Sequence, residues 1–130
     1  MARTLSATDG SPPDANRTTI AGILVHVLGM FFGFVGPGLV YLVSTASFTR
    51  ANAQNAVNWH VFAFGMGLVA VVLAFGLGAI SDVFVIIGAA IGVTVAFLNI
   101  IFCLWATVKA IRGDEWEYPL APTVINSPIQ

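Results

Sequence analysis

Residues 56–108 decide the architecture, and they read AVNWHVFAFGMGLVAVVLAFGLGAI, then Ser81-Asp82, then VFVIIGAAIGVTVAFLNIIFCLWATV. Asp82 is the one Asp, Glu, Lys or Arg in this stretch. A helix needs roughly 20 mostly apolar residues to cross the hydrocarbon core of a bilayer. The two apolar runs therefore predict transmembrane helices at about 56–80 and 83–108. The two-residue link predicts that these helices form an antiparallel hairpin, with Asp82 capping the second one.

A further charge-free interval lies upstream, between Arg17 and Arg50. It predicts another span at about 20–44, so the expected fold class is an all-α integral membrane protein with three transmembrane helices. Gly36-Pro37-Gly38 lies in the second half of this span, where proline removes a backbone donor and glycine weakens a helix. We expect the first helix to be kinked or broken there, and a re-entrant segment is the alternative.

The composition agrees with a membrane protein. Of the 130 residues, 58% are hydrophobic and 8% are charged, whereas a soluble domain is about 25% charged. These values exclude a soluble globular enzyme, a disordered chain and a nucleic-acid-binding protein, which would need a basic patch. The expected partners are the lipid bilayer and another membrane protein or a second copy of this chain, with no nucleic acid.

The segments on either side of the apolar region are polar. Residues 1–19 predict a disordered tail, residues 20–112 the three-helix transmembrane domain, and residues 113–130 an extended tail that contains three prolines. Three spans place the Arg50 loop and the C-terminus on one side of the membrane. Cations favour the cytoplasmic side, and three lie on this side against two on the other: Arg50, Lys109 and Arg112 against Arg3 and Arg17. We therefore expect a multi-pass protein of the cell membrane with the Arg50 loop and the C-terminus in the cytoplasm.

Aromatic and small residues also follow the expected spans. Tyr41, Trp59 and Trp105 fall near the Arg50 side, where aromatic rings favour the membrane interface. Gly88 and Gly92 recur at helical spacing in the last span, and small residues let helices approach closely. We expect this packing to lie within one chain, and a homo-oligomer is the alternative.

Polar residues inside the spans are candidates for helix packing or a polar network. Asn99 lies deep in the last span, where an amide needs a partner on a neighbouring helix; lining a pore is its alternative role. His26, in the first span, is expected to be a hydrogen-bonded packing residue. The stretch from Arg50 to His60 reads RANAQNAVNWH. Its amides, Asn58 among them, are predicted to satisfy carbonyls freed by Pro37, or else to form a polar vestibule.

No set of residues typical of catalysis, cofactor binding or metal binding is recognisable. The chain has no deep pair of carboxylates, and its two histidines lie on different spans. Cys103 is the single cysteine, so it forms no intrachain disulfide and is expected to be a small apolar filler. The sequence therefore predicts a protein that is not an enzyme and has no cofactor.

Four short motifs, over roughly residues 20–120, occur in a recognisable order. They are AGILVH at 21–26, GPGLVY at 36–41, the spaced residues Phe48, Arg50, Ala53, Ala56 and Asn58, and Lys109-Ala110, Gly113 and Tyr118-Pro119-Leu120. Together they resemble the small membrane family called domain of unknown function 4870, which is grouped with the chloroplast import component Tic-twenty. The resemblance implies a three-helix membrane protein without an established activity.

Two functions fit these features. The first is a small non-catalytic membrane protein that packs as an accessory or scaffold subunit against a larger membrane complex. The alternative is a homo-oligomeric channel or translocation component, by analogy with Tic-twenty.

Overall fold

The computed structural model describes residues 18–126, and the regular elements in this range are all helices. They are α1 (Ile20–Phe32), α2 (Val35–Val43), α3 (Ser47–Val71) and α4 (Asp82–Ile111), with a π-helical turn η1 (Val72–Gly76) and a 3-10 turn η2 (Leu77–Ala79) that prolong α3. The all-helical prediction is confirmed for the described residues. Nearly all of the tail predicted at 1–19, and the last residues of the chain, lie outside them.

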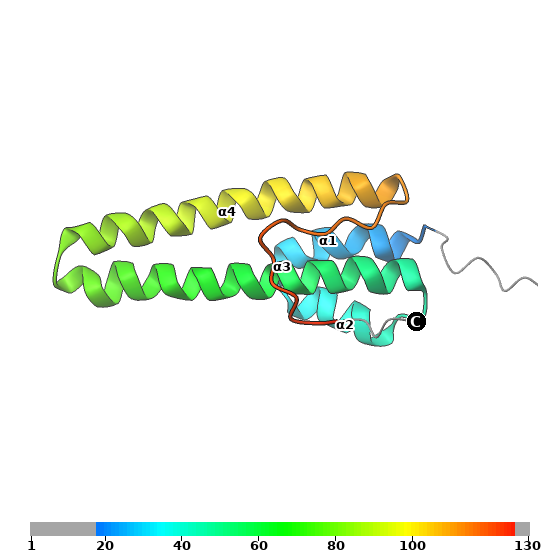
Figure 1. The fold of residues 1–130 in the computed structure, drawn as a ribbon, viewed down its shortest axis with the longest axis horizontal. Coiled ribbons are helices and arrows are strands. Elements are labelled where there is room, and N and C mark those ends of the chain that lie inside the picture. The colour runs from blue at the N-terminus through cyan, green and yellow to red at the C-terminus, as the bar shows by residue number, and fades with distance from the viewer. Residues whose placement is uncertain (1–17, 127–130) are drawn as a thin grey trace, which may run out of the picture.

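A long hairpin of α3 and α4 forms the axis of the molecule (Figure 1). Ser47–Ala79 and Asp82–Ile111 are each long and apolar enough to cross a membrane. The side chain of Ser81 accepts a hydrogen bond from the backbone N–H of Val83, at 3.4 Å. Ser81 is therefore the N-cap of α4, and Asp82 is its first helical residue rather than the cap we expected. The carboxylate of Asp82 still lies where it favours the helix dipole.

The first two helices fold back on each other and lie beside only part of this hairpin (Figure 1). Thr19, at the start of α1, hydrogen-bonds to Thr49 near the start of α3. The turn after α1 brings the ring of Phe34 to 5.6 Å from that of Phe64. α2 then returns, so that Tyr41 lies under the guanidinium of Arg50 at 4.5 Å. The start of α1 and the end of α2 therefore lie at the same end of the hairpin.

This arrangement differs from the predicted span at 20–44. Of the helices described, two are long enough to cross a membrane, and α1 and α2 are shorter; a third span is not shown. The break lies at Gly33, with φ 59° and ψ −141°, rather than at Gly36-Pro37-Gly38. Residues that carry a side chain rarely adopt this backbone conformation, so the glycine permits the reversal. Pro37 lies in the first turn of α2, where the backbone N–H groups have no helical partner, and its missing donor costs little there.

The chain beyond α4 also turns back, at Gly113 with φ 86°. Residues 113–126, here called the C-terminal segment, run along α3 without forming a regular element (Figure 1). The hairpin thus has two parts. The covered half, residues 47–64 and 98–111, lies against α1, α2 and the C-terminal segment. The bare half, defined here as residues 65–97, extends beyond them (Figure 1), except where residues such as Gly67 and Ala96 line a hollow with the turn between α1 and α2.

Candidate functional site

The polar side chains of the covered half form a buried cluster with His26 at its centre. The ring Nε2 of His26 lies 2.9 Å from Oδ1 of Asn52, and its Nδ1 lies 2.9 Å from the hydroxyl of Tyr118. Because an amide oxygen only accepts, Nε2 donates to Asn52 and Nδ1 accepts from Tyr118. The amide nitrogen of Asn52 donates to the carbonyl of Phe48 at 3.0 Å. Every polar atom of this imidazole is therefore occupied by a neutral partner.

Burial of this cluster is nearly complete. His26 and Asn52 have no exposed surface, and Tyr118 is 4% exposed. Burial raises the pKa of the Tyr118 phenol far above its ordinary value, because the charged phenolate would lose its water. The phenol therefore remains a hydrogen-bond donor to His26. The cluster joins α1, α3 and the C-terminal segment.

Three amide side chains of α3 hold the backbone of the C-terminal segment. Oδ1 of Asn58 accepts from the backbone N–H groups of Val124 and Ile125, at 3.0 and 2.9 Å. The amide nitrogens of Gln54 and Asn58 both donate to the carbonyl of Ile125. A segment without helix or strand must find other partners for its backbone groups. These amides supply them.

The third amide and a group of aromatic rings hold the middle of the segment. Asn55 donates to the carbonyl of Trp116 at 3.1 Å. The ring of Tyr118 stacks on that of Trp59, with centroids 5.6 Å apart and planes 6° apart. Phe102 and Trp116 complete this aromatic cluster. Trp59 is fully buried, so its ring packs inside the protein and does not face lipid.

Asn99 connects the two long helices. Its Oδ1 accepts from the indole N–H of Trp59 at 2.9 Å, so the amide joins α4 to α3. The Sγ of Cys103 lies 3.7 Å from the same oxygen and 3.8 Å from Nε2 of His60. His60 donates from Nδ1 to the carbonyl of Ala56. The thiol therefore fills a small polar gap rather than a purely apolar one.

The remaining candidates lie at helix contacts. Gly88 packs closely on α3: a Cβ there would lie 2.6 Å from the carbonyl oxygen of Ala70. Gly92 faces the methyl group of Ala70 at ordinary contact distance. Arg50 donates to the carbonyl of Ser44 at 3.3 Å, near the end of α2.

We had predicted that the amides between Arg50 and His60 bind carbonyls around Pro37, and this prediction was wrong. Their hydrogen bonds go to His26, to α3 itself and to the C-terminal segment. The expectation failed because Pro37 lies in the first turn of α2 and frees no carbonyl in mid-helix.

The described part of the chain contains no group of three or more His, Cys, Asp or Glu side chains that could hold a metal ion. Within residues 18–126, no buried side-chain nitrogen or oxygen is without a hydrogen-bond partner. The buried polar side chains of this region are therefore all hydrogen-bonded, and their bonds join α1, α3, α4 and the C-terminal segment.

Sequence reasoning missed several residues of this cluster. Tyr118 was not a candidate, and Asn52 and Asn55 were considered only as partners for carbonyls near Pro37 or as part of a polar vestibule. Asn52, Asn55 and Asn58 recur every three residues and so lie close together along α3. Trp116 and Tyr118 lie in a proline-containing tail. Large aromatic rings in such a tail could have indicated that it packs against the helices.

Comparison with known proteins identifies the family. A model of the magnetosome magnetite crystal formation protein family (MamF/MmsF) matches residues 16–125. No curated protein matches the chain, and no solved structure matches it. The match covers α1 to α4 and nearly all of the C-terminal segment.

This match corrects the resemblance to domain of unknown function 4870 and Tic-twenty, which was wrong. The motifs on which it rested are explained by packing: His26, Asn58 and Tyr118 hold the C-terminal segment against α1 and α3. Such positions report a fold and do not indicate an import function. The chain belongs to the magnetosome magnetite crystal formation protein family.

Proposed function

We propose that this protein is a non-catalytic membrane subunit that acts as an accessory or scaffold in a larger membrane assembly. The family description supports magnetite crystal formation as the process that this assembly serves. The observation that carries the proposal is the contrast between interior and surface. The buried polar groups of the described residues are all paired, whereas the exposed surface of the long hairpin is apolar.

The surface of the bare half supports a position within the bilayer. Phe75 is 82% exposed and Val93 is 71% exposed. Only 6% of each membrane-span window is buried inside the protein. A soluble protein rarely exposes a continuous apolar surface of this extent, and lipid or another membrane protein would cover it.

The ends of the hairpin support an orientation. Among the described residues, Arg50, Lys109 and Arg112 all lie at the covered end, and the opposite end carries Asp82 and no cation. Cationic residues are retained on the cytoplasmic side. We therefore place the covered half, with both ends of the α1–α2 pair, toward the cytoplasm.

The hydrogen bonds of its two candidate residues do not support the channel alternative. Asn58 and Asn99, its two candidate pore-lining residues, are hydrogen-bonded to the C-terminal segment and to Trp59 of the same chain. We therefore propose the accessory role and not a channel.

Site-specific crosslinking within the native membrane tests the proposal. A photoreactive phenylalanine analogue replaces Phe75, which faces outward, and in a matched variant replaces Phe62, which packs partly on the chain's own core. We expect the Phe75 variant to crosslink to a different protein in stoichiometric yield and the Phe62 variant to crosslink within the chain. Crosslinks from Phe75 to lipid alone, together with a lone monomer in mild detergent, would overturn the accessory role. Crosslinks to a second copy alone would favour the homo-oligomer.

A further inference from the structure

Two adjoining hollows lie at the covered end of α4. The first is apolar, has a cavity volume of about 430 Å³, and is lined by Ile101, Phe102, Leu104, Trp105, Val108 and Trp116. The second has a volume of about 510 Å³ and is lined by Lys109, Gly113, Asp114, Glu115 and Trp116. Trp116 lines both, so the apolar groove along α4 and the charged hollow adjoin at this ring. Each volume falls in the range of small-molecule sites, roughly 300–1,000 Å³.

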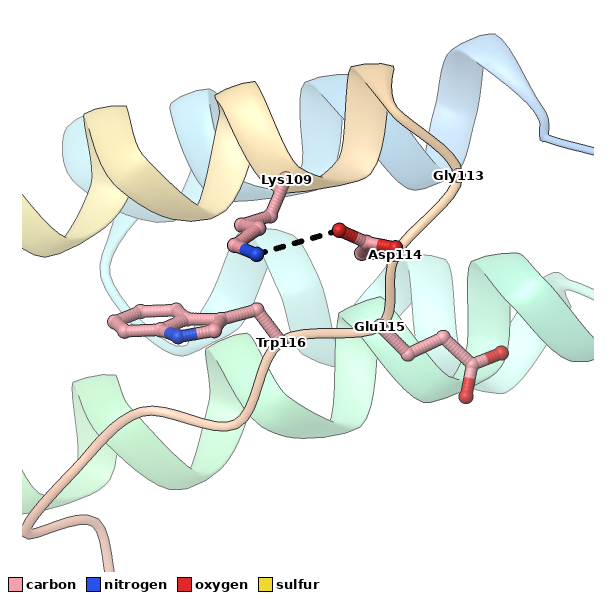
Figure 2. Close-up of a pocket in the computed structure, with 5 residues that line it drawn as sticks. All are labelled: Lys109, Gly113, Asp114, Glu115 and Trp116. Carbon is pink, nitrogen blue, oxygen red and sulfur yellow. Dashed lines mark hydrogen bonds and ion pairs between the residues drawn. The ribbon is translucent and has the colours of Figure 1, made fainter.

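The charged hollow holds one cation and two carboxylates in a fixed order. Lys109 Nζ lies 3.4 Å from Oδ2 of Asp114, and this pair is partly exposed to solvent. Figure 2 shows Glu115 pointing away from Lys109, on the far side of Asp114, while the ring of Trp116 extends in the opposite direction beneath Lys109. The order across the hollow is therefore indole, ammonium, carboxylate, carboxylate. An exposed ion pair of this kind contributes little to stability, so a ligand can displace it at low cost.

The position of the hollows along the chain matches a membrane interface. Lys109 is the first charged residue after the charge-free run of α4, and its ammonium lies 6.0 Å from the centre of the Trp105 ring. Tryptophan and lysine at the end of an apolar helix mark the level of lipid headgroups. With Trp105 and Lys109 at that level, the groove would face the hydrocarbon and the hollow would face the headgroup layer.

We propose that these two hollows form one binding site for a phospholipid with a zwitterionic, ammonium-bearing headgroup, such as phosphatidylethanolamine. The acyl chain lies in the groove between Trp105 and Trp116. The phosphate accepts from Lys109, displacing Asp114. The headgroup ammonium then binds to Asp114, and the exposed side chain of Glu115, which points away from Lys109 in this structure, rotates to join it. A headgroup without a cation, such as that of phosphatidylglycerol, fits less well, because it brings no ammonium to these two carboxylates.

Charge complementarity decides among the possible occupants. A free anion such as phosphate would use Lys109 but leave the apolar groove empty. A neighbouring apolar helix would fill the groove but leave the charged hollow unmatched. A zwitterionic phospholipid satisfies both parts at once, which is why the site is assigned to it.

Lipid titration of the purified full-length protein, followed by native mass spectrometry in mild detergent, tests this site. The probes are dioleoyl phosphatidylethanolamine and dioleoyl phosphatidylglycerol, which share their acyl chains and differ in headgroup charge. We expect the ethanolamine lipid to bind about fivefold more tightly, as expected for one additional charged contact at a headgroup. Equal binding, or tighter binding of the glycerol lipid, would overturn the proposal.

Matched variants locate the effect. Lys109→Gln removes the partner of the phosphate, and Arg112→Gln removes a neighbouring cation that does not line the hollow. Glu115→Gln removes a partner of the ammonium, and Glu117→Gln removes an exposed carboxylate that lines a different hollow. We expect Lys109→Gln and Glu115→Gln each to weaken binding of the ethanolamine lipid about fivefold and the two controls to leave it unchanged. Equal losses in a variant and its control would overturn the site. All four positions are partly or fully exposed, so the fold is retained; an unchanged temperature of thermal unfolding for each variant checks this.

Discussion

The covered half and the bare half of the hairpin belong to the same two helices but are held together by different interactions. In the covered half, α3 and α4 are joined by the hydrogen bond between Trp59 and Asn99 and by the edge-to-face contact of Trp59 with Phe102. α1 and the C-terminal segment are held to these helices by His26, by three amides and by the stacking of Tyr118 on Trp59. In the bare half, contact rests on small residues: Gly88 packs against Ala70 and Ala74.

This difference reflects what surrounds each half. Lipid supplies no hydrophobic driving force for helices to associate, so in the bare half the two helices are held together by close packing of small residues. The C-terminal segment has backbone groups that need partners, so polar side chains gather where it lies. Each of the following substitutions alters contacts in one half of the hairpin, and the other half stays unchanged for comparison.

The largest effect is expected from Gly88→Leu in the bare half. A Cβ at this position would lie 2.6 Å from the carbonyl oxygen of Ala70 in α3 and 2.7 Å from the amide nitrogen of Ala74 in η1, so the helices must separate. We expect a loss of about 3 kcal/mol in the free energy of unfolding, measured by thermal unfolding in detergent. Gly65→Leu is the control, because a Cβ at Gly65 meets nothing within 4 Å. Similar losses in both variants would show that close packing at Gly88 is unimportant.

Next in size is Asn52→Leu in the covered half. The substitution leaves Nε2 of the fully buried His26 without its acceptor. An unsatisfied buried donor costs about 2 kcal/mol, and the same unfolding measurement should show it. Thr94→Val, at an exposed position of the bare half, is expected to change stability little. If Asn52→Leu lowers the stability no more than Thr94→Val does, the hydrogen bond between His26 and Asn52 does not stabilise the cluster.

Asn58→Ala should free the end of the C-terminal segment without unfolding the helices. Two backbone donors and one carbonyl lose this partner, although Gln54 still binds Ile125. We expect a local loss of about 1.5 kcal/mol, seen as faster hydrogen exchange in residues 113–126 and unchanged exchange in the bare half. Uniform acceleration across both halves would mean that the segment is needed for the whole fold.

The smallest effect concerns the bond between Trp59 and Asn99. A double-mutant cycle with Trp59→Phe and Asn99→Leu isolates their interaction, which should amount to about 1 kcal/mol for a hydrogen bond between helices in a membrane protein. Additive losses in the cycle would show that the two residues stabilise the helices independently.

The same contrast explains which parts of the structure were accessible to sequence reasoning. The bare half follows from local rules: an apolar run, Ser81-Asp82 and a second apolar run suffice for the hairpin. The covered half depends on contacts between residues far apart in the chain, such as His26 with Tyr118, and no local pattern reports them. The C-terminal segment was therefore expected to be extended, and its docking on α3 was missed.

The first apolar run shows a second limit. Its length fits one span, and nothing in its composition distinguishes a crossing helix from a pair that turns back. We predicted the break at Pro37 because proline commonly breaks helices, whereas the reversal occurs at Gly33, where the backbone needs a positive φ.

The central claim is that α1 and α2 turn back, so that Thr18 and Thr45 lie at the same end of the hairpin. Single cysteines at Thr18, Thr45 and Ile80, introduced into a Cys103→Ala background, report this directly with a membrane-impermeant maleimide applied to sealed vesicles of either orientation. We predict that Thr18→Cys and Thr45→Cys react from the same face and Ile80→Cys from the opposite one. Reaction of Thr18→Cys and Thr45→Cys from opposite faces would restore the three-span arrangement and contradict the account.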